Sequence, residues 1–547
     1  MERTMTRIFF WMIVLVPTTL AVGWKGSGKG GAVAAGNGRA VSAGISILEQ
    51  DGNAADAAAA TLLALSITDF GSFCIGGEAP FMYADSKTGK VTVLAGQGVA
   101  PQLATVENFE KTGIPRAFRP NNLANAAVPA IIDLCVTALR EYGSMRFEQV
   151  VAPSLAILKR GGNGWYPDLA RTFERLVEAE RAHPDERIAG LQAVADRFYR
   201  GDIADELDAW YRANGGLIRK VDLAAHVTHI EEPLSIDYHG YTVYKCGVWT
   251  QGPFMLQTLR LLESHDLKAM GHLSADYIHV VAEAMKLAFA DRDTYYADPR
   301  MIEVPLDALL SAEYAKLRAP LINPQKASRL IRPGDPINMK ALMQPDAESA
   351  ESAADDQDTT TCLVADRWGN VVACTPSGWG STAGAGGLTG ITHGTRLISL
   401  NNWPGHPNAI APGKRPRITL TPTLVFKDGK PLLAISVVGG DLQDQVGLQL
   451  LLDALEFDMS PAEAVTAPRF STAHHVNSFS QTPPKKGSLT LYPVIREEVR
   501  AALGSRGHRV GTKKGVIGLP CMLRIDPDGT LHAAGDPRAG RHAAALP

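Results

Sequence analysis

The chain has no large excess of charge of either sign. Its 547 residues include 54 Lys and Arg against 57 Asp and Glu, a formal net charge of -3. Proteins that bind nucleic acid or anionic lipid over a broad surface carry a strong basic excess. A composition of 45% hydrophobic and 20% charged residues is instead that of a chain that builds a large core. We therefore expect a small-molecule partner and no binding to nucleic acid.

Cysteine is scarce, and its spacing indicates no metal or redox site. Six cysteines lie scattered along the chain without a CxxC pair. Cys362 and Cys374 fall on the two arms of a predicted hairpin. If Ala365 pairs with Asn370, the two thiols point to opposite faces of the sheet. We therefore expect buried free thiols.

Long hydrophobic runs are also missing. The apolar run at 8–16 follows Arg3 and Arg7 and falls well short of the about 20 residues that span a bilayer. Small residues at 21–23 then supply a plausible cleavage site, so the segment has the shape of a signal peptide. We expect residues 1–23 to be removed, giving a periplasmic or secreted protein without stable membrane insertion.

Several partial motifs lack the residues that would complete a ligand site. Residues 23–30 nearly match a phosphate-binding loop, but the Ser or Thr that would hold magnesium and a preceding strand are missing, so we expect a linker. The adjacent His474 and His475 would point opposite ways on a strand, without a third ligand. A third group shares one helical face, for which we expect a solvated or domain-facing stripe: His279, Glu283 and Lys286.

The most informative stretch is 356–375, DQDTTTCLVADRWGNVVACT, which predicts a β-hairpin that begins on threonines. Ahead of it lies an acidic, alanine-rich tether at 346–358 with almost nothing that could enter a core. Cutting the chain before Thr359 would give this residue a free α-amine beside its hydroxyl, which is one way to activate an alcohol nucleophile. An ordinary strand start after an acidic loop is the alternative.

TTTCLVADRWGNVVACTPS resembles the start of the small subunit of the γ-glutamyltransferase (glutathione hydrolase) family. ILEQDGNAADAAAATLLAL, followed by IGG, resembles the opening of the large subunit, and further matches follow in order along nearly the whole chain. The resemblance implies an α/β N-terminal-nucleophile hydrolase with a four-layer αββα sandwich, made as a proenzyme. Self-cleavage between Asp358 and Thr359 would give a heterodimer of a large subunit, 31–358, and a small catalytic subunit, 359–547.

The resemblance also implies catalytic roles. Thr359 would attack an amide carbonyl while its α-amine relays the proton, and Ser377 would donate a hydrogen bond to the Thr359 hydroxyl or amine. Gly439 and Gly440, at the end of a predicted strand at 432–438, would form the oxyanion hole, because two glycines let backbone N–H groups approach a ligand closely. A further strand is expected at 396–400. No metal and no cofactor are needed.

The residues that would recognise glutamate depart from the family. Gln97 stands where the family has the Arg that holds the substrate α-carboxylate. After Asn402, Trp403 and His406 stand where the family has a Gln or Glu and then the Asp that receives the α-amino group. A pocket without both charges should bind a γ-glutamyl zwitterion poorly.

Other positions near the nucleophile have changed in the same direction. The paired serines of the family become Ile418 and Thr419, and an Asn that flanks the nucleophile becomes Trp379. Trp379 and Trp403 indicate a flatter, more apolar acyl group, with Arg417 the nearest replacement cation. Three interpretations remain: a glutathione-type γ-glutamyl hydrolase or transferase, an amidase for another acyl group, as in relatives that cleave oxamate or cephalosporin side chains, and a non-catalytic binding protein.

Overall fold

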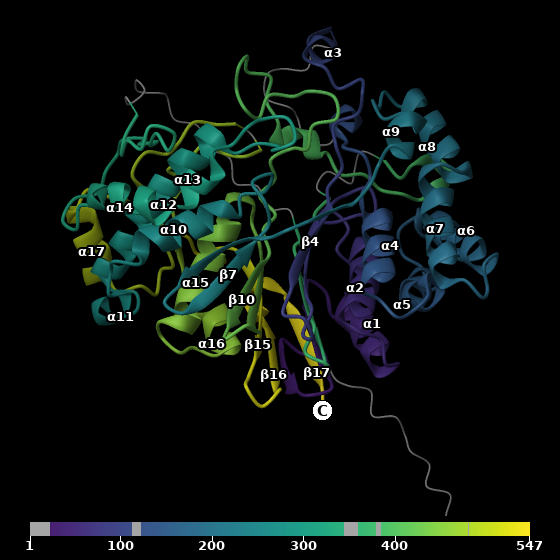
Figure 1. Cartoon of the computed structure of the whole chain (residues 1–547), viewed down its shortest axis with the longest axis horizontal. Helices are drawn as coiled ribbons and strands as arrows, with labels where there is room; N and C mark the ends of the chain where they lie inside the picture. The colour runs from purple at the N-terminus through teal and green to yellow at the C-terminus, as the bar shows by residue number, and fades with distance from the viewer. Residues whose placement is uncertain (1–21, 112–121, 344–358, 379–383, 480) are drawn as a thin grey trace, which may run out of the picture.

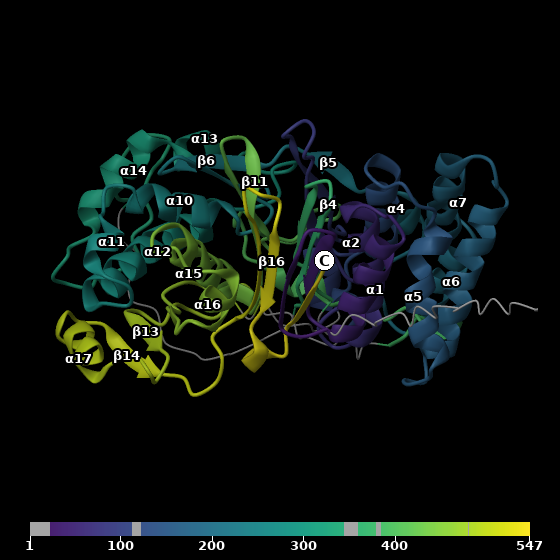
Figure 2. The same cartoon turned by 90° about the horizontal axis from the view of Figure 1, so that it is seen from below.

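The computed structural model describes residues 22–111, 122–343, 359–378, 384–479 and 481–547. Two seven-stranded sheets lie face to face in the centre of the molecule, and helices cover both outer faces (Figures 1 and 2). The predicted four-layer αββα sandwich is therefore confirmed. Among the helices of these residues, none combines the length and the apolar character needed to cross a bilayer. Most of the predicted signal peptide and the whole acidic tether lie outside the described residues.

The first sheet is antiparallel and mixes strands from both sides of the predicted cleavage site. Its order is β17 (His542–Leu546), β2 (Gly31–Ala35), β8 (Cys362–Asp366), β9 (Val371–Cys374), β3 (Ala79–Ala84), β4 (Val91–Gly96) and β5 (His229–Glu231). The second sheet mixes the two sides in the same way. Its order is β1 (Lys25–Gly28), β16 (Leu531–Gly535), β15 (Leu519–Ile525), β11 (Lys430–Val438), β10 (Thr423–Lys427), β7 (Tyr241–Lys245) and β6 (Leu234–Tyr238).

Each outer face of the sandwich has its own set of helices. The helices on the side of the first sheet are α1 (Gly38–Glu49), α2 (Ala54–Thr68), α4 (Ile131–Glu141), α5 (Phe147–Lys159), α6 (Tyr166–Arg181), α7 (Arg187–Tyr199), α8 (Asp202–Ala213) and α9 (Lys220–Ala224). The second has α10 (Pro253–Leu262), α11 (Leu267–Met270), α12 (Ala275–Tyr295), α13 (Leu306–Leu310), α14 (Ala312–Arg318), α15 (Gln443–Leu455) and α16 (Pro461–Thr466). Near these lie α17 (Glu497–Ser505) and a small sheet of β12 (Phe470–Ser471), β13 (Ser488–Leu491) and β14 (Arg509–Thr512), and α3 (Val106–Lys111) stands apart.

The core follows the layers. One buried cluster packs the first sheet against its helices, a second packs the other sheet against α10, α12 and α15, and a third fills the space between the sheets. The third is rich in small residues such as Ala32, Ala34 and Ala365, which let the sheets approach closely. Because strands covered on both faces have no solvated side, every residue of β2, β3, β4, β8 and β9 is buried, and most of these residues are apolar.

The segment expected to be a linker at the N-terminus is instead strand β1. It pairs with β16, about 500 residues later in the chain, a partner that local sequence cannot reveal. Its glycines serve close packing, because a Cβ at Gly28 would lie 1.8 Å from the carbonyl oxygen of Leu546 and one at Gly26 would lie 2.7 Å from the nitrogen of Ala545. The resemblance to a phosphate-binding loop therefore has a structural cause.

The predicted hairpin is present as β8 and β9, but its register differs by one residue from the expectation. Ala365 pairs with Val371, and Cys362 lies directly opposite Cys374. The turn is a three-residue loop in which Gly369 adopts φ +87°, a left-handed conformation that glycine allows without strain. Both thiols are buried and free. Asp366 in the turn also accepts a hydrogen bond from the Ala54 backbone at 2.9 Å, so the hairpin caps the start of α2.

Candidate active site

Thr359 lies three residues before the start of β8, is 1% exposed, and has φ +123°. A positive φ is a strained conformation for a β-branched residue and typically costs about 1–3 kcal/mol. The strain is located at the residue whose peptide bond is predicted to be cut. Because φ is defined by the preceding carbonyl carbon, a chain that begins at Thr359 has no such constraint. Asp358, on the other side of this bond, lies outside the described residues.

The side-chain amide of Gln443, the first residue of α15, lies 3.4 Å from Thr359 Oγ1 and 3.5 Å from Thr419 Oγ1. Oriented so that its nitrogen donates to the carbonyls of Thr419 at 3.0 Å and Val437 at 3.3 Å, the amide presents its oxygen to the two hydroxyls. Gln443 therefore fixes the direction in which the Thr359 hydroxyl points. Sequence reasoning found Thr359 and Thr419 but missed Gln443, since an isolated Gln at a helix start carries no signal.

The residue after Thr359 fixes the start of the strand. The Thr360 backbone N–H donates to the Pro376 carbonyl at 2.8 Å, and its hydroxyl donates to Asp69 and accepts from Arg541 Nη1 at 3.1 Å. Asp69 ends α2, and Arg541 lies just before β17. Three distant parts of the chain thus hold the position from which the nucleophile projects.

Ser377 is buried beside the same strand start, where it exchanges two backbone hydrogen bonds of 2.9 Å with Glu78. Arg396 donates from Nη2 to Ser377 Oγ and from Nε to Glu78 Oε1, both at 2.6 Å. Because the Ser377 oxygen accepts from Arg396, its proton is directed away from the guanidinium. The predicted hydrogen bond from Ser377 to Thr359 stays a prediction, and Trp379 lies outside the described residues.

The predicted strand at 396–400 is wrong, because Arg396–Ser399 form a short 3-10 helix. Its backbone bonds are local, with Ile398 N–H reaching the Thr395 carbonyl at 3.3 Å. Leu397 and Ile398 are both buried in a small separate cluster, so neither face is free to join a sheet. The tight turn places the Arg396 guanidinium between Glu78 and Ser377.

Gly439 and Gly440 follow β11 directly and have φ +136° and +55°. The chain bends sharply here, since the Leu442 N–H returns to the Gly439 carbonyl at 2.9 Å. A side chain at Gly439 would be strained and would crowd Leu442, whose Cβ would lie 3.2 Å away. The 13-residue helix α15 begins three residues later, and its positive N-terminal end favours negative charge nearby. The loop therefore has the conformation and the field that an oxyanion requires.

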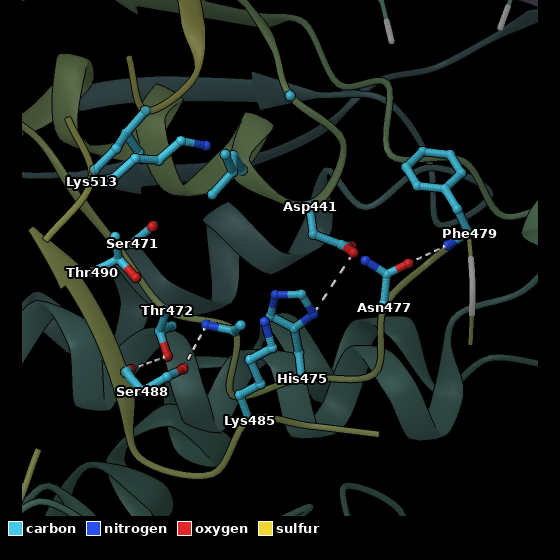
Figure 3. Close-up of a pocket in the computed structure, with 14 residues that line it drawn as sticks. Asp441, Ser471, Thr472, His475, Asn477, Phe479, Lys485, Ser488, Thr490 and Lys513 are labelled. Carbon is cyan, nitrogen blue, oxygen red and sulfur yellow. Dashed lines mark hydrogen bonds and ion pairs between the residues drawn. The ribbon is translucent and has the colours of Figure 1, made fainter. Parts of the chain in front are cut away.

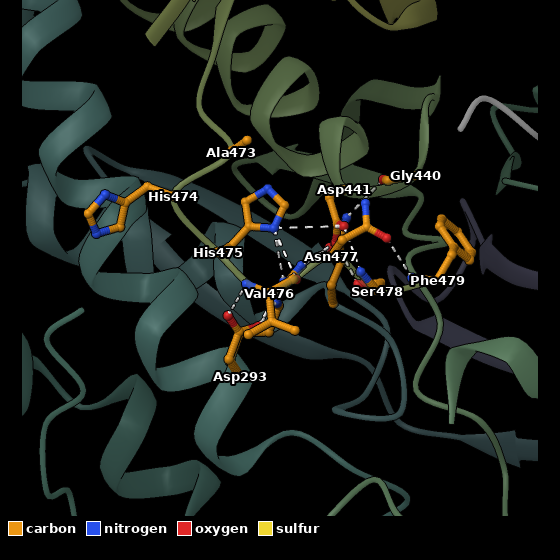
Figure 4. Close-up of polar contacts among 12 residues, drawn as sticks. Asp293, Gly440, Asp441, Ala473, His474, His475, Val476, Asn477, Ser478 and Phe479 are labelled. Atoms are coloured by element: carbon orange, nitrogen blue, oxygen red, sulfur yellow. Dashed lines mark hydrogen bonds and ion pairs between the residues drawn. The ribbon is translucent and has the colours of Figure 1, made fainter. Parts of the chain in front are cut away.

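Asp441, directly after the two glycines, is the centre of a buried polar network (Figure 4). Its Oδ1 accepts from Arg292 Nη1 at 2.5 Å and from Ser478 Oγ at 2.6 Å, and its Oδ2 accepts from Ser478 N–H at 2.9 Å. His475 Nδ1 lies 3.8 Å from Oδ2. Burial opposes ionisation, but Arg292, His475 and these hydrogen bonds together hold the pKa of Asp441 well below its usual range.

The network around Asp441 explains two residues that the sequence left without a role. Arg292 lies in α12, and His475 belongs to the adjacent His pair. The pairing of Arg292 with Asp441 spans 149 positions, so it leaves no local signal. His474, the other member of the pair, binds the Leu330 carbonyl and the Gly487 N–H.

Gln97, predicted to replace a carboxylate-binding Arg, is buried just after β4. Its Nε2 donates to the Gly98 carbonyl at 3.0 Å, while its Oε1 has no hydrogen-bond partner among the described residues. Asn402 also has a buried side-chain oxygen without a partner in this part of the chain. Buried acceptors of this kind are costly unless a ligand or water satisfies them.

His406 is the residue predicted to replace the acidic group that receives an ammonium. Its Nδ1 accepts hydrogen bonds of 3.0 Å from Asn401 Nδ2 and from the Asn408 backbone, and its ring meets Trp403 edge-on at 5.3 Å. Burial, with Arg417 nearby, lowers the pKa of His406 to about 4. The imidazole is therefore neutral at pH 7 and provides no charge for an ammonium group.

Arg417 is a buried cation that lacks a carboxylate partner within salt-bridge distance in the described chain. It is 5% exposed, its Nη2 donates to Ser478 Oγ at 3.1 Å, and its Nη1 has no partner among the described residues. Burial and the neighbouring Arg292 lower its pKa to about 10. With His406 it lines a cavity of about 20 Å³, which fits roughly one water molecule. Arg417 is thus connected to Asp441 through Ser478.

A larger pocket of about 420 Å³ opens beside Gly439 (Figure 3). Its described lining includes Asp441, His475, Lys485 and Lys513. Gln97, Asn402, Trp403, His406, Arg417 and Thr419 are not part of that lining.

The helical stripe on α12 is buried rather than solvated. His279 Nδ1 lies 2.9 Å from His508 Nε2, and their ring nitrogens and a Glu283 oxygen lie within 4.8 Å of one another. Glu283, however, already pairs with Lys286 and with Arg332, the latter at 2.9 Å. Two cations beside the carboxylate disfavour a metal ion there, so the group is a structural ion-pair network that joins α12 to its neighbours.

Comparison with known proteins places these features in a family. The family model for gamma-glutamyltranspeptidase matches residues 40–163 and 164–546. The chain is 32% identical over 557 residues to the glutathione hydrolase proenzyme of Escherichia coli (strain K12), covering 93% of this chain and 91% of that protein. It is 30% identical over 545 residues to the acylase ACY 1 proenzyme of Pseudomonas sp. (strain SE83), with 93% and 92% covered. The crystal structure of cephalosporin acylase from Bacillus halodurans superposes with a TM-score of 0.80 at 26% identity, covering 99% and 100%.

Proposed function

The chain belongs to the gamma-glutamyltranspeptidase family and is an amide hydrolase or acyltransferase, and from this premise we propose that it uses Thr359 to cleave amides whose acyl group is not γ-glutamyl. The observation that carries the proposal is the conformation of Thr359, a strained β-branched residue at the predicted new N-terminus. The altered glutamate-binding positions support the second half of the proposal. Relatives named as acylases exist beside those named as glutathione hydrolases, so both substrate classes occur among proteins similar to this one.

The first reaction is self-cleavage between Asp358 and Thr359. The Thr359 hydroxyl oxygen attacks the Asp358 carbonyl carbon, and the acyl group moves from nitrogen to oxygen. Water then hydrolyses the ester, which leaves a carboxylate on Asp358 and a free α-amine on Thr359. The products are a large subunit that ends at Asp358 and a small subunit, 359–547, which remain together because both sheets contain strands from each.

The second reaction uses the new amine. Thr359 Oγ1 bonds to the substrate carbonyl carbon while its proton passes through the α-amine to the leaving nitrogen, and the C–N bond breaks. Gly439 and Gly440 hold the oxyanion, and Gln443 orients the hydroxyl. Water or an amine then takes the acyl group from Thr359 Oγ1. This chemistry requires no metal or cofactor.

The acyl group is expected to lack an α-amino function. Gln97 is neutral, His406 is neutral at pH 7, and both occupy positions where the family binds the two charges of glutamate. Trp403 offers an aromatic surface, with Asn402 and Thr419 as polar contacts. Arg417, whose Nη1 is unpartnered among the described residues, is the cation available to an acyl carboxylate. We further propose that the mature protein is periplasmic or secreted.

Replacing Thr359 tests the proposal. Purified wild type should run as two chains on a denaturing gel, with Thr359 as a new N-terminus by sequencing, whereas Thr359→Ala should stay one chain and cleave no amide. Thr361→Val is a matched control, because its hydroxyl contacts only the weak acceptor Cys521 at 3.2 Å among the described residues. Processing of Thr359→Ala at the same bond would show that an outside protease makes the cut. An uncut wild type would support a binding protein.

A further inference from the structure

Another cavity, of about 560 Å³, lies where the two predicted subunits meet, in the region where α17 packs against α12 (Figure 1). Its volume lies within the range of about 300–1,000 Å³ that holds small-molecule ligands. Residues 321, 323, 326–330 and 332 line it from the larger subunit, and Arg506 and Gly507, just after α17, line it from the smaller one. The described lining includes none of the residues predicted for catalysis or substrate binding.

The walls of this cavity carry positive charge. The described lining contains neither Asp nor Glu, and its cations are Lys326, Arg329, Arg332 and Arg506. Outside the lining, Glu283 pairs with both Arg332 and Lys286, and Asp276 pairs with Arg506. Two carboxylates thus serve five cations.

The two cations left over are exposed and have room for a ligand. Arg329 donates to the Gly507 carbonyl, at 3.0 Å from Nη2 and 3.2 Å from Nε, and forms no ion pair with a described residue. The Lys326 ammonium has neither a hydrogen-bond partner nor an ion-pair partner in the described part of the chain. Both side chains can therefore turn toward a bound anion without breaking a salt bridge.

Arg332 is the buried cation of the lining, with 9% of the residue exposed. Its Nη1 donates to the Leu321 carbonyl at 2.8 Å, and its Nη2 donates to Glu283 Oε2 at 2.9 Å. Its buried Nε has no hydrogen-bond partner among the described residues. A buried donor without an acceptor is costly unless a ligand or water satisfies it. Arg332 therefore keeps one N–H available for a ligand oxygen.

Hydrogen bonds fix the walls across the predicted subunit boundary. The Ala327 N–H donates to the Arg506 carbonyl at 2.8 Å, and Lys286 Nζ donates to the Ser328 carbonyl at 2.6 Å. Burial, together with Lys286, His279 and Arg506, lowers the pKa of the neighbouring His508 to about 3, so this ring is neutral at pH 7. The fold thus holds like charges close together, and a bound anion would relieve their repulsion.

We propose that this cavity, the basic pocket, binds a phosphorylated small molecule. A phosphate ester carries about two negative charges on one tetrahedral group, whereas a carboxylate carries one, so phosphate matches the surplus of cations better. Guanidinium groups donate to phosphate oxygens in a fork geometry, and three of the four cations in the lining are Arg. The inference is independent of the proposed function, because it uses none of the residues assigned to amide cleavage.

Calorimetry of the purified protein with inorganic pyrophosphate, at pH 7 and constant ionic strength, tests the basic pocket. Wild type should bind pyrophosphate at one site, and added sodium chloride should weaken the binding. Lys326→Gln/Arg329→Gln removes the two exposed cations and should raise Kd about tenfold or more, because each cation loses a charge-assisted contact. The melting temperature without pyrophosphate checks that this variant keeps its fold.

Lys316 and Arg496 provide a matched control, because both are exposed and neither is in the described lining of the basic pocket. Lys316→Gln/Arg496→Gln removes the same net charge and should change Kd less than twofold. Equal losses in the two double variants would overturn the proposal, since they would reflect overall charge. Failure of wild type to bind pyrophosphate, or equally tight binding of the dicarboxylate succinate, would also overturn it.

A further variant distinguishes a separate ligand from the chain's own acidic tether. The Met343 N–H donates to the carbonyl of Pro333, the residue after Arg332, and the tether at 346–358 follows three residues later in the sequence. Asp346→Asn/Glu348→Gln/Glu351→Gln removes three of its charges. An unchanged Kd for pyrophosphate supports a site for a separate molecule. A Kd at least tenfold lower would show that the tether competes for the basic pocket, and would overturn the small-molecule assignment.

Discussion

Arg292 and Asp441 form a fully buried ion pair whose members lie on opposite sides of the predicted cleavage site. Arg292 Nη1 lies 2.5 Å from Asp441 Oδ1, and the guanidinium also binds Gln251, Asp293 and the Val476 carbonyl. Asp441 follows the two glycines of the oxyanion loop. The position of that loop is therefore set by a residue of the large segment, which ties catalysis in one subunit to the packing of the other.

Asp441→Asn should destabilise the protein and slow its self-cleavage. Removing the carboxylate leaves a buried guanidinium without one of its partners, which costs about 3 kcal/mol, at the low end of such losses because Asp293 remains. The free energy of unfolding, from urea titration, measures the first effect, and denaturing gels over time measure the second. Asp526→Asn is the control, because its ion pair with Arg524 is partly exposed, with 34% and 31% of the Arg524 and Asp526 side chains accessible, and is worth about 0–1 kcal/mol. Similar losses in the two variants would contradict a special role for the buried pair.

Glutaryl-p-nitroanilide should be a better substrate than γ-glutamyl-p-nitroanilide, from which it differs only by the amino group. Each charge-assisted hydrogen bond that we propose is lost at Gln97 and His406 is worth about 1.5–3 kcal/mol. Two such losses weaken recognition of the γ-glutamyl group by a few hundred-fold or more, at about 1.4 kcal/mol per factor of ten. The measurement is kcat/KM for both compounds. A clear advantage for the γ-glutamyl compound would mean that another residue restores the ammonium site and would return the protein to glutathione metabolism.

Stability should fall as pH drops below about 6.5, partly because of His393. Burial lowers the pKa of this histidine to about 4, whereas the unfolded chain protonates it near 6.5. Between these values the unfolded state binds the extra proton, so stability is lost as pH falls, by up to about 3 kcal/mol, and this loss stops below about 4. His393→Gln should therefore show a weaker pH dependence of the urea midpoint between pH 7 and 4.5. His183→Gln, at an exposed position, should match wild type; a match by His393→Gln would contradict the assignment.

All six thiols should be unreactive in the native protein. Each is buried, and burial raises the thiol pKa, to about 11 for Cys521 and about 12 for Cys135. Because the thiolate is the reactive form, Ellman's reagent should detect almost no thiol in the native protein and six after denaturation. Four after denaturation would indicate a disulfide, for which Cys362 and Cys374 are the candidates because they lie directly opposite each other.

The layers of the fold were predictable because they depend on long patterns and on a collinear resemblance. The structural predictions that were wrong depended on single residues or on distant partners. The hairpin register shifted by one because Gly369 allows a three-residue loop, and strand β1 was missed because its partner lies at the other end of the chain. A strand was expected at 396–400, where a short 3-10 helix forms instead. A brief, largely apolar segment that is buried on both sides fits either structure.

The residues of the candidate site also divide into those that a short motif indicates and those that only long-range contacts reveal. Thr359, Gly439 and Gly440 belong to short motifs, and all three have positive φ values, while the roles predicted for them stay predictions. Gln443, Ser478 and Arg292 act through contacts between segments that are distant in sequence, so no local pattern indicates them. The pocket with Lys485 and Lys513 was missed for the same reason, since one lysine precedes β13 and the other follows β14.

Strand β2 lies between β17 and β8, so the first strand of this sheet in the sequence is completed by the last strand of the chain. The ribosome exposes β2 more than 300 residues before β8 and more than 500 before β17. Strand β1 is likewise synthesised about 500 residues before its partner β16. Neither sheet can be completed before β16 and β17 have been synthesised, and contacts of such long range form slowly. Loss of β17 would leave β2 with an open edge, so an error late in synthesis would expose a strand made near its beginning.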